Sequence, residues 1–305
     1  MSAVKVILGA AALAAALIGA GCLDGDNIGG NQNNGQDAQV DEDAQAPVDG
    51  SEVGDAGTSG DASTPTGGTI SIYLAGDSTP KTFTDGLAGQ TPTSYVIALS
   101  EYWAQTSLSD PSPAFCFDTG AAPVEADLSG DTLMGVCDTQ ALPTAVYTHG
   151  RVKVDWARYT VQGTLHYQGM PFAGAFTFFR AYSDTTYLGD AYLAGEGFIE
   201  YSGPTQVTIP TTYDPPLSFP GVVVETVGGA CWMTFPYSQP LAVDQTNLDH
   251  HWARFHWEIY EGFRWQDRSD TGFADGVWDV GMTVPETEEV IFAGATGYYT
   301  TASTD

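Results

Sequence analysis

Hydrophobic and polar residues alternate along much of the chain after residue 69, as expected for strands with one buried face. In 69–75, Ile70, Ile72 and Leu74 fall on one face and polar residues fall on the other. The stretch 252–265 alternates in the same way. Its apolar positions predict a core face, and its polar positions predict an outer face with an Arg254–Glu258 ion pair. The core positions are Ala253, Phe255, Trp257 and Ile259, and the outer positions are Arg254, His256, Glu258 and Tyr260.

Glycine and proline separate the remaining apolar runs. A hairpin is predicted over 145–167 with its turn at Gln162–Gly163, and a second over 222–235 with its turn at Gly228–Gly229. The segment 110–130 is rich in Pro, Gly and Asp and predicts a loop. The run 94–103 also fits a helix, but its Tyr, Val and Ile favour a strand. Further strands are expected at 133–136, 172–182, 187–201, 206–209, 289–293 and 298–301.

No segment combines a helical period with helix caps. Many short strands with Gly and Pro turns predict an all-β fold, an antiparallel β-sandwich or open barrel, over residues 69–305. The proline-rich segment 210–220 marks a boundary if this region consists of two packed subdomains.

The N-terminus has a different pattern. Lys5 precedes an uncharged apolar run, 6–18, which is shorter than the roughly 20 residues that a membrane-spanning helix needs. A basic start, a short apolar run and small residues after it predict a signal peptide over residues 1–21.

The residues that follow, Gly19-Ala20-Gly21-Cys22, resemble the lipobox of bacterial lipoproteins. That resemblance implies lipidation of Cys22, and Leu23 after it implies transfer to the outer membrane. Gly19 departs from the pattern, which has an aliphatic residue at that position. Ordinary cleavage after Ala20, giving a secreted protein, is the alternative.

Residues 22–68 predict a disordered acidic linker. After Cys22 and Leu23 this segment contains ten Asp and Glu residues and no Lys, Arg, Trp, Tyr or Phe. Such a sequence buries too little apolar surface to offset the entropy of ordering it. The linker would therefore separate the lipid anchor from the β-rich domain.

The chain has a formal net charge of -29. Residues 69–305 hold 28 acidic and eight basic residues, so this region alone is strongly negative. Its field repels phosphate backbones and anionic lipid, which argues against nucleic acid as a partner. Contact with the membrane is expected through the lipid anchor alone.

Three cysteines remain after Cys22. Export implies an oxidising compartment, so we expect a Cys116–Cys137 disulfide and a buried free thiol at Cys231. A bridge from Cys231 to one of the other two is the alternative.

His256 and Glu258 lie two residues apart on one strand face, a spacing that lets both reach one metal ion. This predicts a metal-dependent enzyme if a third ligand comes from another histidine. The candidates are His250, His251, His166 and His149.

A second candidate metal site follows that strand. The loop 267–281 resembles the EF-hand-like calcium loops of bacterial surface proteins through its Asp275-Gly276-x-x-Asp279 segment. The resemblance implies Ca²⁺ bound by carboxylates. Thr271 and Phe273 occupy expected ligand positions, and Met282 replaces the expected glutamate. The alternative is an Asx turn without an ion. The candidate ligands are Asp267, Asp270, Asp275 and Asp279.

These patterns predict a lipid-anchored envelope or surface protein whose β-sandwich has a structural or binding role rather than an enzymatic one. A polysaccharide or an envelope protein is the expected partner. The alternatives are the metal-dependent enzyme and a carbohydrate-binding module that uses aromatic residues.

Overall fold

The computed structural model describes residues 67–120, 122–213, 221–246, 248–270, 272–281 and 287–304. The predicted signal peptide, Cys22 and nearly all of the predicted linker lie outside these residues. Within the described ranges, no helix has the length and apolar character to cross a membrane. The only helix among them is one 3₁₀ turn, Thr139–Ala141.

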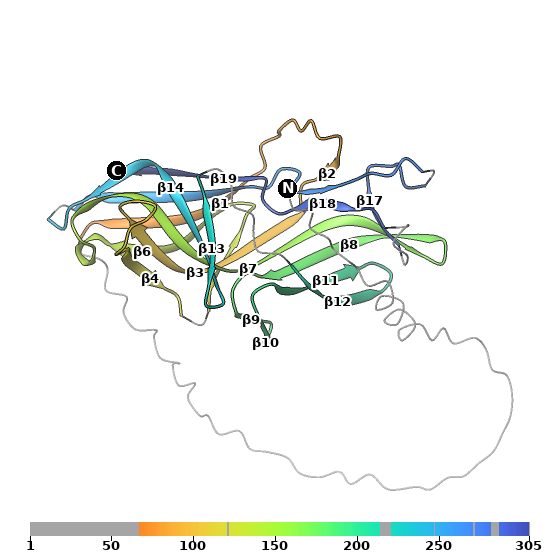
Figure 1. The fold of residues 1–305 in the computed structure, drawn as a ribbon, viewed down its shortest axis with the longest axis horizontal. Helices are drawn as coiled ribbons and strands as arrows, with labels where there is room; N and C mark the ends of the chain where they lie inside the picture. Colours follow the sequence, from red (N-terminus) through yellow and green to blue (C-terminus); the bar gives the residue numbers. More distant parts are fainter. Residues whose placement is uncertain are drawn as a thin grey trace, which may run out of the picture. The chain divides into compact units, whose positions relative to one another are not determined.

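One sheet of the described domain has four strands in the order β19-β15-β1-β6. The first and last strands of the domain thus belong to one sheet, with β15 between them (Figure 1). β1 pairs with β15 in parallel and with β6 in antiparallel orientation. The bounds are β1 Thr69–Asp77, β6 Asp131–Asp138, β15 His250–Glu258 and β19 Gly297–Thr304.

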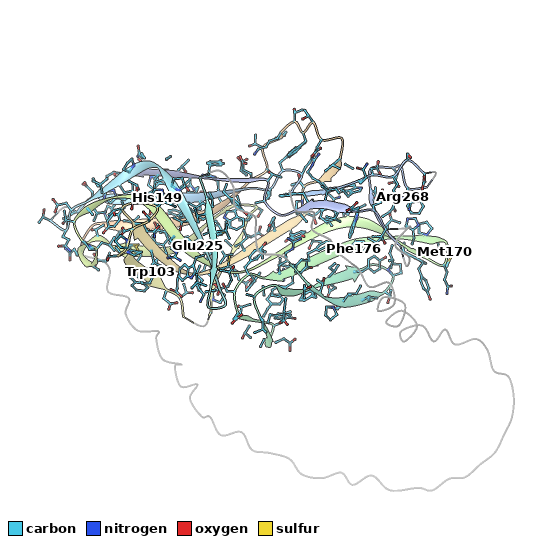
Figure 2. All side chains as sticks on the ribbon, viewed as in Figure 1. Trp103, His149, Met170, Phe176, Glu225 and Arg268 are labelled. Atoms are coloured by element: carbon cyan, nitrogen blue, oxygen red, sulfur yellow. A yellow bond between two sulfur atoms is a disulfide. The ribbon has the colours of Figure 1, made fainter. Side chains whose placement is uncertain are left out.

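The other large sheet has ten strands and is built around β7, Ala145–Tyr167. One edge of β7 pairs with β14 and then with β8, and the other edge pairs with β3 and then with β17. Figure 2 places His149, near the start of β7, at the opposite end of the domain from Met170, which follows its end. The other bounds are β3 Ser94–Gln105, β4 Ala114–Asp118, β5 Val124–Asp127, β8 Met170–Ala181, β11 Glu196–Ser202, β12 Gln206–Thr212, β13 Val223–Val227, β14 Ala230–Val243 and β17 Trp278–Gly281.

Two small sheets complete the described domain. Their bounds are β9 Thr185–Tyr187 and β10 Asp190–Tyr192 in one, and β2 Ala88–Gln90, β16 Phe263–Trp265 and β18 Val290–Ala293 in the other. The segment predicted as one strand over 252–265 is therefore two strands, separated by a bend at Glu261 with φ of 44°.

The main core lies between the two large sheets. Ile72 and Phe255 from the four-stranded sheet belong to the same buried cluster as Val154 and Met233 from the ten-stranded sheet. The predicted all-β sandwich is thus confirmed, with the difference that the β1–β15 and β7–β17 pairings are parallel. β12, which ends at Thr212 inside 210–220, and β13, which follows that segment, belong to one sheet.

The hairpin predicted at Gln162–Gly163 is wrong, because β7 continues without a break to Tyr167. The turn lies at Gln168–Gly169, where both residues have positive φ. Gly163 serves a different purpose: a Cβ there would lie 2.8 Å from the carbonyl oxygen of Trp278. The glycine lets β17 approach β7 closely. The hairpin at Gly228–Gly229 is confirmed.

The loop predicted for 110–130 is also wrong in part, because β4 and β5 form there and pair with β3. These strands are short and half-exposed, so they show little of the apolar alternation that marks a buried strand.

Cys116 and Cys137 form the predicted disulfide, with Cα atoms 4.9 Å apart. Cys116 is in β4 and Cys137 is in β6, so the bond joins the two large sheets. Cys231 is a buried free thiol, as expected.

Candidate functional site

The outer face of the four-stranded sheet presents aromatic and basic side chains together. Alternation turns Ala253 and Phe255 into the core, so Trp252 and Arg254 point outward. The parallel pairing of β1 with β15 places Tyr73 directly opposite Arg254. Residues more than 170 positions apart in the sequence thus lie side by side.

Arg254 holds this group together. Its guanidinium carbon lies 5.5 Å from the ring centre of Tyr73 and 5.3 Å from that of Trp252. Arg254 also pairs with Asp131 of β6, Nη2 to Oδ2, at 2.7 Å. Cation–π contacts of this kind fix the orientation of half-exposed rings. The Arg254 Nε–H has no hydrogen-bond acceptor among the described residues.

A depression with a volume of about 350 Å³ lies on this face. Its lining combines two aromatic rings with hydroxyl, imidazole and guanidinium groups. The residues are Thr69, Ser71, Tyr73, His250, His251, Trp252 and Arg254. We call this group the four-stranded platform. Such a mixture of flat apolar surface and convergent polar groups is typical of a ligand site.

The predicted His256–Glu258–His250 metal site does not come together. His256 lies outside the depression, where it stacks on Tyr299 with ring centres 4.2 Å apart and bonds Thr301 Oγ1 at 3.0 Å. Glu258 pairs with Lys81 rather than with Arg254. His250 bonds Thr69 Oγ1 at 2.9 Å.

Two histidines of this region, His251 and His256, have lowered pKa values. Burial lowers the pKa of His256, and the nearby Arg254 charge lowers it further. Burial also lowers the pKa of His251, whose Nδ1 bonds Thr304 Oγ1 at 2.7 Å. A neutral imidazole both donates and accepts hydrogen bonds, which suits recognition of hydroxyl groups.

The four candidate calcium ligands do not gather around one point. Asp270 pairs with Arg268, and Asp275 Oδ1 accepts a hydrogen bond from the backbone N–H of Val277 at 2.9 Å. The latter is the Asx turn that was the alternative to an ion. Among the described residues, no three His, Cys, Asp or Glu side chains are grouped so that they could hold a metal ion. Met282 and Thr271 lie outside the described residues.

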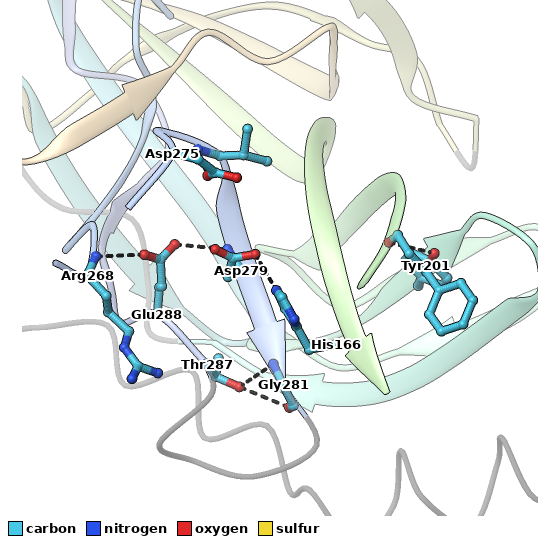
Figure 3. Close-up of polar contacts among 10 residues, drawn as sticks. His166, Tyr201, Arg268, Asp275, Asp279, Gly281, Thr287 and Glu288 are labelled. Atoms are coloured by element: carbon cyan, nitrogen blue, oxygen red, sulfur yellow. Dashed lines mark hydrogen bonds and ion pairs between the residues drawn. The ribbon is translucent and has the colours of Figure 1, made fainter. Parts of the chain in front are cut away.

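Asp279 is instead part of a buried polar chain (Figure 3). Its Oδ1 lies 2.6 Å from His166 Nε2, and its backbone N–H donates to Glu288 Oε2 at 2.9 Å. Glu288 Oε1 accepts from the Arg268 backbone N–H at 2.8 Å. Asp279 and Glu288 are each 1% exposed. The sequence singled out His166 and Asp279 separately, but nothing in it indicated Glu288.

Burial raises the pKa values of the two carboxyl groups in this hydrogen-bonded network. It raises the pKa of Glu288 to about 7, because the loss of water outweighs the two backbone N–H donors. Burial also raises the pKa of Asp279, against the favourable bond from His166. Asp279 Oδ2 has no partner among the described residues. The chain fastens β17 to β7 and to the segment at Arg268.

The sequence offers Tyr182, Tyr187, Tyr192 and Tyr201 as candidates for sugar stacking, but the structure packs them against other side chains. Tyr187 lies against Trp156 and Phe179, and Tyr192 lies against Phe179. Tyr201 is 2% exposed and contacts Phe176. Tyr182, Tyr187 and Tyr201 belong to the core clusters and Tyr192 packs against one of them, so these tyrosines serve packing.

Neither a family model nor a curated protein nor a solved structure matches this chain. The geometry of the four-stranded platform is therefore the feature that bears on function.

Proposed function

We propose that this protein is an exported, lipid-anchored module that binds polysaccharide through the outer face of its four-stranded sheet. One observation carries the proposal: Tyr73, Trp252 and Arg254 form a fixed aromatic and basic group beside a depression of about 350 Å³.

The chemistry of the platform matches that of a sugar. A pyranose ring has an apolar face of C–H groups that packs on an aromatic ring, and hydroxyls at its rim that need donors and acceptors. Tyr73 and Trp252 supply the rings. Thr69, Ser71 and His250 supply hydroxyl and imidazole groups, and Arg254 supplies an Nε–H without an acceptor.

The charge of the domain selects among polysaccharides. Residues 69–305 carry 28 acidic and eight basic residues. An acidic polymer would be repelled over its whole length, although Arg254 could hold one carboxylate. An uncharged polysaccharide is therefore the ligand class that we propose.

The sequence supports the cellular part of the proposal. The lipobox-like segment at Cys22 and the acidic linker after it would hold the domain away from an outer membrane. A polysaccharide-binding face on a long tether would then attach the membrane to material around the cell.

The test is binding of the purified full-length chain, in detergent, to an array of uncharged polysaccharides, followed by calorimetry with those retained. Trp252→Ala is expected to weaken binding at least tenfold, and Trp252→Phe to retain most of it, since a flat ring remains. Tyr299→Ala is the control, because Tyr299 is exposed on the same face but does not line the depression. Unchanged affinity in Trp252→Ala, or binding of no polysaccharide, would refute the proposal.

A further inference from the structure

A second depression, with a volume of about 230 Å³, lies on the outer face of the ten-stranded sheet. The register of the strands assembles it: Arg151 of β7 lies opposite Thr234 of β14, and Thr234 lies opposite Val223 of β13. The segment after β3 closes one side. The lining residues are Gln105, Leu108, Ser109, Asp110, Arg151, Val223, Glu225 and Thr234.

Two buried polar atoms in this lining lack partners. Gln105 is 3% exposed, yet its Oε1 accepts no hydrogen bond among the described residues. Arg151 Nε likewise has no acceptor there, although Nη2 pairs with Glu225 at 3.2 Å. An unpaired buried acceptor or donor costs about 1–3 kcal/mol. One carbonyl and one N–H in the same depression are satisfied together by a group that both donates and accepts.

Aromatic rings flank the depression. Arg151 lies 4.8 Å from the ring centre of Trp232. Trp103, directly opposite Arg151 on β3, packs edge-on against Phe115, and Phe115 is 48% exposed. The arrangement repeats that of the four-stranded platform, an outward arginine beside aromatic rings and a polar hollow, on a different sheet.

The rim of this depression excludes anions. Hydrogen bonds from the Thr106 and Ser112 backbone N–H groups lower the pKa of Asp110, so it is ionised. Glu225 is more than half exposed in its side chain and pairs with Arg151. Asp110 and Glu225 therefore leave one net negative charge beside Arg151, which disfavours a uronic acid or a phosphate.

We infer that this depression is a second carbohydrate site, which takes a single uncharged sugar unit. A hydroxyl group donates to Gln105 Oε1 and accepts from Arg151 Nε, as an alcohol can and a pure donor or acceptor cannot. The ligand class rests on the function proposed above. Because the two large sheets pack through their inner faces, their outer faces point away from each other. One domain can then link two polysaccharide chains.

The test uses calorimetry of the full-length chain with the methyl glycosides of glucose, galactose, mannose and N-acetylglucosamine. Gln105→Met keeps the side-chain length but removes the carbonyl, and Arg151→Lys removes Nε–H. Each variant is expected to abolish glycoside binding in this depression. For a glycoside that occupies both depressions, the number bound per chain then falls from two to one. Lys153→Ala is the control, on the same sheet face but outside the lining. Thermal melts show that each variant is folded.

The outcomes separate the two proposals. If Trp252→Ala removes one site and Gln105→Met removes the other, both proposals stand. If Gln105→Met and Arg151→Lys leave stoichiometry and affinity unchanged, the second site is refuted and the first remains. If only the Gln105 and Arg151 variants lose binding, the four-stranded platform is refuted as a site. If no glycoside binds to the depression at Gln105, the second site is refuted.

Discussion

Asp155 is a residue whose backbone supports the fold while its buried carboxyl group destabilises it. It lies in β7 at the point where the pairing partner on one edge changes from β14 to β8. Its backbone carbonyl accepts from Tyr182 and Ser183, which locks this junction. Its carboxyl is almost fully buried, 3.9 Å from Lys153 Nζ. Burial raises the pKa of Asp155 to about 6 from 3.8, and the Lys153 charge offsets this only in part.

The pKa shift of Asp155 predicts a pH-dependent stability. The pKa of Asp155 is higher in the folded state than in the unfolded state. The contribution of Asp155 to the free energy of unfolding is therefore most favourable below pH 3.8 and is lost as the pH rises to about 6. Asp155→Asn should therefore raise the free energy of unfolding by about 1–3 kcal/mol at pH 8, and by much less at pH 4. Urea denaturation of the native and variant chains at both pH values measures this difference in the free energy of unfolding. A pH-independent difference would contradict this, and the exposed Asp190→Asn is the control.

Individual partners were the least predictable part of the molecule. The outward positions of Arg254 and Glu258 followed from alternation, but their ion pair did not form. Asp131 comes from β6 and Lys81 from the segment between β1 and β2, and period-two patterning carries no information on which segment is the neighbour. For the same reason the sequence does not show that Tyr73 and Trp252 lie on neighbouring strands, although alternation places each side chain on the outer face.

At the scale of elements, the disulfide has a role beyond closing a loop. It ties β4 in the ten-stranded sheet to β6 at the edge of the four-stranded one. β6 is bound to its own sheet only through β1. The bond therefore fastens an edge strand of one sheet to a short strand of the other.

Removing the bond should destabilise the fold. Closing a segment with a sequence separation of 21 contributes about 3 kcal/mol through the entropy of the unfolded chain. The Cys116→Ser, Cys137→Ser double variant should lose about that much in the free energy of unfolding. Reductant should lower the melting temperature of the native chain and leave the double variant unchanged. Equal stability of the native and double-variant chains would contradict this role.

Strands with a buried face were predictable and strands at edges were not. β15 follows the alternation over its whole length and β1 follows it as far as Leu74. β4 and β5 are half-exposed, so their sequences satisfy few packing constraints. The turn predicted at Gly163 does not form, because the sequence does not distinguish a glycine that permits close packing of strands from one that forms a turn. The two depressions depend on strand neighbours, so no local pattern could have located them.

At the scale of the whole molecule, the proposed lipid anchor would decide where the proposed binding faces act. Cys22 lies outside the described residues, so its lipidation stays a prediction from the lipobox-like segment. In a bacterial host with an outer membrane, the native chain should fractionate with that membrane, and Cys22→Ser should appear in the soluble fraction. Cys231→Ser is the matched control and should remain in the membrane. Mass spectrometry of the mature N-terminus should find an acylated Cys22; a chain beginning at Gly21 would show ordinary secretion instead.

The position of β1 has a mechanical consequence. A pull on the chain from before residue 67 reaches Gly68, whose carbonyl accepts from Thr139, and then Thr69, the first residue of β1. β1 is held on both edges, by β15 along all nine of its residues and by β6 along most of them. A force along the strand therefore loads both ladders of hydrogen bonds in shear, so that many must break together. If the chain is anchored as proposed, the pairing of β1 on both edges would resist tension at the tethered end.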